Sequence, residues 1–249
     1  MAMGKTRADG RDSDQLRPVQ IHSNYLESAP GAVLIEMGKT RVICTVALED
    51  RVPPFLVGTG KGWLTAEYGM LPGSSPKRIA RETSTGKVNS RGREIQRLIG
   101  RALRATVDLN QIGERTLYVD CDVIQADGGT RTASITGSYL ALQQAINLLT
   151  RNNVLSSSPI IRRAAAVSVG LVDDKVLLDL DYSEDSRAQA DVNLVMDGDG
   201  GILELQGTAE GRPYTRDEAD RLLDVGASGI DQLLDIQTAS YDSWLGDST

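Results

Sequence analysis

The sequence predicts a mixed α/β fold, in which several short strands precede a helix in each half of the 249-residue chain. In the first half, the alternating stretch 116–124 is typical of a strand. Apolar residues at helical spacing follow it and predict a helix over about 132–150; they are Ile135, Tyr139, Leu142, Ile146 and Leu149. In the second half, four strand-like runs precede a helix that opens at a capping box between Thr215 and Glu218.

The remaining elements follow from local patterns. Residues 1–14 are polar and rich in Gly, Asp and Arg, so we expect a disordered tail. Gly38 and Lys39 form a hairpin turn between two strands, and residues 51–62 form a loop. The segment 152–159 is the best internal boundary. The predicted strands are 20–23, 32–37, 40–49, 116–124, 164–171, 175–182, 192–196 and 202–208, and a further helix covers 91–104.

Composition excludes several classes of protein. No apolar run approaches the roughly 20 residues of a membrane helix, and the first ten residues lack the apolar segment of a signal peptide. Cys44 and Cys121 lie in apolar stretches without metal-type spacing, which favours reduced core residues of a cytoplasmic protein over a disulfide. His22 is the single histidine, so acid–base chemistry must depend on carboxylates.

Charge is distributed unevenly along the chain. Residues 77–104 carry nine Lys or Arg against Glu82 and Glu94, so this segment has a net charge of +7 in a chain of −7. Such asymmetry is typical of a surface that contacts nucleic-acid phosphates, although a solvated helix face explains some of the charges. Arg91 faces the apolar side of its helix, where a bound anion would account for it. Lys77, Arg78 and Arg81 lie in an exposed loop.

The run Gln125–Gly137 is the most informative local motif. It places Gly129, Thr130 and Arg131 where a strand ends and a helix begins. Free amides at a helix start, together with an arginine, form a site suited to phosphate. The alternative is an ordinary helix start with a surface arginine.

Several long motifs in this order resemble the ribonuclease PH family of phosphate-dependent 3′-exoribonucleases. They comprise the run above, the segments 62–72, 91–104 and 203–211, and the run 184–193. The resemblance extends from about Leu16 to about Gln232 without a large gap.

This resemblance implies a fold related to the second domain of ribosomal protein S5. It implies one compact domain over 15–249, built from two βα halves at about 15–152 and 159–249, and a hexameric ring made as a trimer of dimers. The expected partner is RNA, chiefly transfer RNA precursor 3′ ends, with neither DNA nor membrane. Lys77, Arg78 and Arg81 would contact that RNA.

The resemblance also implies chemistry. Arg91, Gly129, Thr130 and Arg131 would hold the attacking inorganic phosphate. Asp185 would act as general acid, and Asp191 would bind Mg²⁺ or Mn²⁺, although these two roles could be shared or exchanged. Two alternatives stay open: a non-catalytic RNA-binding ring subunit of the exosome-core type, and a hydrolytic nuclease on the same scaffold.

Overall fold

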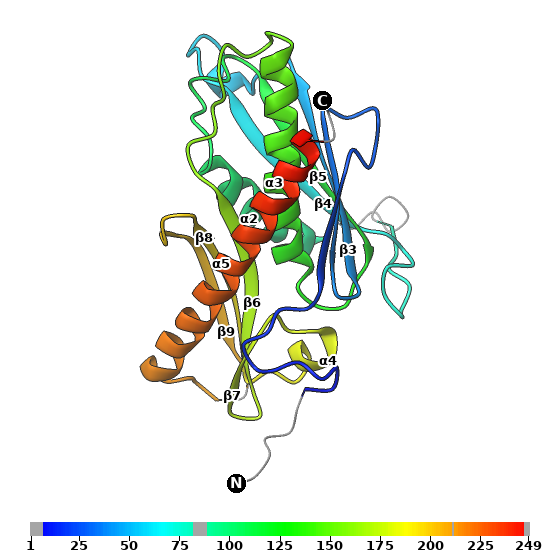
Figure 1. Cartoon of the computed structure of the whole chain (residues 1–249), viewed down its shortest axis with the longest axis vertical. Coiled ribbons are helices and arrows are strands. Elements are labelled where there is room, and N and C mark those ends of the chain that lie inside the picture. Colours follow the sequence, from blue (N-terminus) through cyan, green and yellow to red (C-terminus); the bar gives the residue numbers. More distant parts are fainter. Residues whose placement is uncertain (1–6, 82–88, 211, 247–249) are drawn as a thin grey trace.

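The computed structural model describes residues 7–81, 89–210 and 212–246 (Figure 1). A five-stranded sheet in the order β1-β2-β3-β5-β4 forms the first half. All neighbours in it are antiparallel except β4 and β5, which are parallel. Its strands are β1 (Val19–Ser23), β2 (Gly31–Met37), β3 (Thr40–Glu49), β4 (Trp63–Met70) and β5 (Thr116–Gln125). β4 was not among the predicted strands, since small residues such as Ala66 and Gly69 weaken its alternation.

The second half contains an antiparallel sheet in the order β7-β6-β8-β9. Its strands are β6 (Ala164–Val172), β7 (Lys175–Leu178), β8 (Ala190–Asp197) and β9 (Ile202–Ala209). The predicted strand over 175–182 is too long, because the chain leaves the sheet at Asp179, where φ is +52°. A one-turn helix, α4 (Tyr182–Asp185), follows instead.

Three longer helices complete the fold, along with the 3₁₀ turn η1 (Pro54–Leu56). They are α2 (Ser90–Arg104), α3 (Thr130–Arg151) and α5 (Arg216–Gly246). The capping box that opens α5 is confirmed, since Thr215 and Glu218 exchange backbone-to-side-chain hydrogen bonds of 2.7 and 3.2 Å. α5 packs on β6, β7 and β8 (Figure 1).

α3 joins the two halves. It packs against β2 and β3 of the first sheet and against β6 of the second. Most of its side chains are buried, which is why it lacks a polar face. One hydrophobic cluster contains residues of both halves, including Ile35 and Leu194. This shared core supports the expectation of one domain.

The N-terminal segment corrects one expectation from composition. Residues 1–14 were expected to be disordered, and residues 1–6 lie outside the described residues. Residues 7–14 are instead ordered, because the buried side chains of Arg7 and Arg11 bond to the segment 178–184. Composition alone does not reveal such long-range partners.

The cysteines are placed as the sequence predicts. Cys44 and Cys121 are buried free thiols on neighbouring strands. Among the described helices, none combines the length and the apolar character that crossing a membrane requires.

Candidate active site

The turn between β5 and α3 is built on two glycines in the left-handed region, Gly128 at φ +76° and Gly129 at φ +62°. A Cβ on Gly128 would lie 2.6 Å from the carbonyl oxygen of Leu180, and one on Gly129 would lie 2.9 Å from Nη2 of Arg17. The glycines therefore let the turn pack against the chain's own segment ahead of α4. Gly129 is the N-cap of α3 and has no side chain to bond the first amides.

Thr130 and Arg131 are the first residues of α3, and each contacts a side chain of another strand. The Oγ1 of Thr130 lies 2.8 Å from the hydroxyl of Tyr68 in β4. Nη1 of Arg131 donates to Oε1 of Gln206 in β9 at 3.1 Å. Neither Tyr68 nor Gln206 was predicted as a site residue, although both lie within motifs that carried the family resemblance.

The two candidate carboxylates come from adjacent elements. Asp185 ends α4, and Asp191 lies near the start of β8, opposite Gly170 of β6. Oδ2 of Asp191 accepts a hydrogen bond of 3.4 Å from Asn193, whereas its Oδ1 is buried without a hydrogen-bond partner. A buried carboxylate oxygen without a partner is costly, so Asp191 is suited to a proton or a bound cation.

Both carboxyl groups have altered acidity. The pKa of Asp191 is raised from 3.8 to about 6, first by burial and then by the charge of Asp185. Burial also raises the pKa of Asp185, while the positive charges of Arg91 and Arg131 oppose that rise. Perturbed carboxyl pairs of this kind are concentrated at functional sites.

Arg91 completes the cluster from the start of α2. Its side chain is exposed, yet its charge acts on Asp185, Asp191 and Tyr68. The structure therefore brings together candidate residues from α2, α3, α4 and β8. The charges of Arg91 and Arg131 act on both Asp185 and Asp191, so the four side chains form one electrostatic cluster.

Arg17 ties this cluster to the N-terminal segment. Its Nη2 pairs with Oδ1 of Asp179 at 2.7 Å, and both side chains are almost fully buried. Nη1 of Arg17 donates to the carbonyl of Asp127 in the glycine turn at 2.6 Å. One arginine thus connects the turn ahead of α3 to the segment ahead of α4.

The basic loop between β4 and α2 starts next to the same turn. The amide of Ala126 donates to the carbonyl of Ser74 at 2.7 Å. Lys77, Arg78 and Arg81 are exposed in this loop. The base of this loop therefore lies beside the glycine turn, although about 50 residues separate the two in sequence.

The basic face of α2 is only partly available for a ligand. Arg101 pairs with Glu204 of β9 at 2.6 Å, and the guanidinium of Arg104 stacks 4.6 Å from the ring centroid of Trp63. Arg93 and Arg97 are exposed. Arg101 therefore lies on a solvated helix face with a surface partner, whereas Arg104 is partly buried against Trp63.

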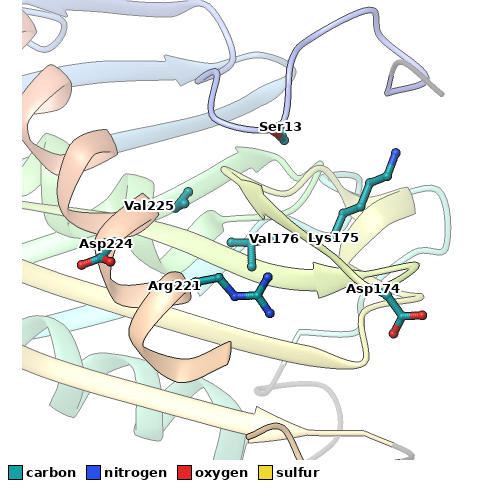
Figure 2. Close-up of a pocket in the computed structure, with 7 residues that line it drawn as sticks. All are labelled: Ser13, Asp174, Lys175, Val176, Arg221, Asp224 and Val225. Carbon is teal, nitrogen blue, oxygen red and sulfur yellow. The ribbon is translucent and has the colours of Figure 1, made fainter. Parts of the chain in front are cut away.

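A cavity of about 380 Å³ lies away from this cluster, between the N-terminal segment, β7 and α5 (Figure 2). Its lining includes Lys175 and Arg221 as well as Asp174 and Asp224, so it has no dominant charge. None of the candidate site residues lines it. We therefore locate the active site at the arginine and carboxylate cluster, where the chemical groups converge.

Comparisons with known proteins identify the family of the chain. Family models match the chain at residues 15–146, as the 3′ exoribonuclease family, domain 1, and at residues 163–229, as domain 2 of the same family. A ribonuclease PH of Moorella thermoacetica is 54% identical over 231 residues, which cover 93% of this chain and 92% of the relative. One of Bacillus cereus is 54% identical over 232 residues, covering 93% and 95%.

Solved structures show the same fold at lower identity. The Archaeoglobus fulgidus exosome with RNA bound to its active site aligns with a TM-score of 0.78 and 23% identity, covering 92% of this chain and 91% of that one. Rice Rrp46 aligns with a TM-score of 0.76 and 19% identity, covering 94% and 100%. The chain belongs to the 3′ exoribonuclease family. Within that family it is a phosphorolytic exoribonuclease of the ribonuclease PH type.

Proposed function

We propose that the cluster of Arg91, Thr130, Arg131, Asp185 and Asp191 removes 3′-terminal nucleotides from transfer RNA precursors and other RNA by phosphorolysis. An oxygen of inorganic phosphate attacks the last phosphodiester, the bond to the preceding 3′-oxygen breaks, and a nucleoside 5′-diphosphate leaves. The observation that carries this proposal is the electrostatic coupling of two arginines to two carboxyl groups of raised pKa.

Phosphate recognition belongs to the arginine side of the cluster. The reaction brings two anions together, so the protein must supply positive charge and fixed donors. The uncapped start of α3 offers backbone amides and the positive end of a 22-residue helix. Arg131 is oriented by Gln206, and Thr130 by Tyr68, so both side chains start from defined positions. Arg91 adds a second guanidinium from α2.

The carboxylate side serves the leaving group. The departing 3′-oxygen needs a proton, and a carboxyl group with a raised pKa can hold one closer to neutral pH. We assign this role to Asp185, whose pKa is raised by burial and whose charge interacts with Arg91, Arg131 and Asp191. Because two negative charges close together repel each other, Asp185 and Asp191 together retain a proton to higher pH than a single carboxyl group would.

The same two carboxylates fit a divalent cation. Mg²⁺ or Mn²⁺ would give the buried Oδ1 of Asp191 a partner. It would also reduce the repulsion between the negative charges of Asp185 and Asp191. Among the described residues, no group of three or more His, Cys, Asp or Glu could hold a metal. Asp185 and Asp191 would hold this cation, together with water and phosphate oxygens. When bound, the cation would neutralise charge on the reacting phosphates.

The substrate and the assembly extend this proposal. Lys77, Arg78 and Arg81 are exposed on a loop whose base borders the glycine turn, so they are suited to grip RNA beyond its 3′ end. The archaeal relatives of this fold are exosome cores. By this relationship we infer a ring of six subunits that acts in the cytoplasm.

The test measures trimming of a 3′-extended transfer RNA precursor with and without inorganic phosphate, and identifies the released nucleotides. We expect phosphate-dependent trimming that yields nucleoside diphosphates. Release of monophosphates without phosphate would identify a hydrolytic nuclease. Binding of RNA without any released nucleotide would identify a non-catalytic ring subunit.

A further inference from the structure

The N-terminal segment holds the short helix that carries Asp185. Residues 7–17 run beside the segment 178–185, far away in sequence, and Figure 1 shows the dark blue N-terminal chain next to α4. α4 has only four residues, too few to be stable as an isolated helix. Contacts from outside must therefore fix its position.

Arg7 makes most of these contacts. Its Nε donates to Oε1 of Glu184 at 2.7 Å, and its Nη2 lies 2.5 Å from Oε2. It also donates to the carbonyls of Leu178 at 2.7 Å and Asp179 at 3.0 Å. Both charged side chains are only 4% exposed, so this forked pair is shielded from water and its geometry is fully specified.

Glu184 belongs to the same helical turn as Asp185 and so connects Arg7 to it. It forms a capping box with Asp181, in which Oε2 of Glu184 accepts from the Asp181 amide at 3.1 Å and Oδ1 of Asp181 accepts from the Glu184 amide at 3.0 Å. The amide of Asp185 then donates to the carbonyl of Asp181 at 2.9 Å. The carboxylate that binds Arg7 is thus part of the turn that sets the position of Asp185.

Arg11 reinforces the same segment. Its Nη1 donates to the carbonyl of Asp179 at 3.0 Å, and its Nη2 lies 3.6 Å from Oε2 of Glu184. Two buried arginines therefore converge on Glu184 and anchor its carboxyl group.

We propose that Arg7 is a positioning residue for the reaction, acting through Glu184 to hold Asp185 against Asp191 and the arginines. This inference rests on the proposed role of Asp185. Arg7 itself does not contact the reacting groups. Its removal should lower kcat, because a displacement of about 1 Å in a catalytic group can cost about 100-fold in rate.

The experiment compares Arg7→Met, Glu184→Gln and the double variant in the full-length protein. For each, kcat and KM are measured on a short oligonucleotide at saturating phosphate, RNA binding is measured without phosphate, and stability is measured by urea unfolding. We expect both single variants to lower kcat about 10- to 100-fold, with RNA binding changed less than about threefold.

The double variant separates positioning from stability. Arg7→Met leaves Glu184 with only the 3.6 Å contact to Arg11, and Glu184→Gln leaves the buried charge of Arg7 without its carboxylate. The double variant removes both charges of the Arg7–Glu184 pair, while Arg11 keeps Asp9 as a partner, so its stability should recover relative to the single variants. Its kcat should stay low, because the tether to α4 is still missing. Recovery of kcat together with stability would overturn the proposal. If Arg7→Met does not fold, Glu184→Gln, which keeps the shape of the side chain, gives the same kcat comparison.

Two further variants act as controls. Arg163→Met removes the hydrogen bond from Arg163 to Thr238. Arg163 directly precedes β6, at the other end of this strand from Gly170, which pairs with Asp191. This variant should leave kcat unchanged. Asp185→Asn tests the proposed function itself. If Asp185→Asn is inactive and Arg7→Met has normal kcat, only the positioning role is wrong. If Asp185→Asn is active, the assignment of Asp185 is wrong, and there is no catalytic group for Arg7 to position.

Discussion

Replacing Arg131 with alanine removes a positive charge from the site while leaving most of the fold in place. The side chain is partly exposed and makes one described hydrogen bond, of 3.1 Å, to Gln206. Losing a single hydrogen bond of this kind costs about 1 kcal/mol of folding stability. α3 itself should stay in place, because most of its other side chains are buried against the two sheets.

The expected effect on catalysis is much larger. A fixed group that stabilises developing charge typically contributes about 2.7–4 kcal/mol, which is roughly 10²–10³ in kcat. Arg131 also lowers the pKa of both Asp185 and Asp191, so its removal should raise both pKa values further. Activity should therefore fall far more than stability, which is the signature of a role in the reaction.

The assay measures kcat for a short oligonucleotide at saturating phosphate, with urea unfolding in parallel. Arg131→Lys keeps the charge but loses the forked donor geometry, so its activity should lie between those of wild type and the alanine variant. Arg97→Ala is the matched control, since Arg97 is an exposed arginine on the outer part of α2. Near-normal turnover in Arg131→Ala would refute the phosphate-binding assignment.

Three further predictions concern metal, pH and charge. Activity should require Mg²⁺ or Mn²⁺ and disappear in excess EDTA; full activity in chelator would remove the metal role and leave Asp185 and Asp191 as acid–base groups only. Because the folded-state pKa of Asp191 is raised to about 6 from 3.8, its ionisation destabilises the fold increasingly as pH rises through this interval. Asp191→Asn should therefore be more stable than wild type at pH 8, by up to about 3 kcal/mol, with the gain lost below pH 4; equal urea midpoints at pH 8 would contradict this. Replacing Lys77, Arg78 and Arg81 with alanine should weaken binding of a transfer RNA precursor and reduce its log–log salt slope by about two to three, with little change for a short oligonucleotide; equal losses on both substrates would instead assign the loop to the pocket or the assembly.

Local patterns were sufficient for most elements of the fold. The helix after residue 130 and the capping box at Thr215 were predicted from apolar spacing and capping residues, because these signals act within a few residues. β4 was missed, and the strand after Lys175 was predicted four residues too long. The second error arose because Arg17 binds Asp179 and draws the chain out of the sheet, a contact that local alternation does not encode.

Sequence by itself determined the types of element, the concentration of basic residues before α3 and the residue types available for chemistry, since these depend on composition and short-range spacing. Only the tertiary structure decided which distant residues meet. The approach of Arg91 to Asp185, the support of Arg131 by Gln206 and the burial of Arg7 against Glu184 all follow from packing two sheets around α3. Contacts between residues 75 to 177 positions apart depend on how whole elements pack, and no local pattern specifies that packing.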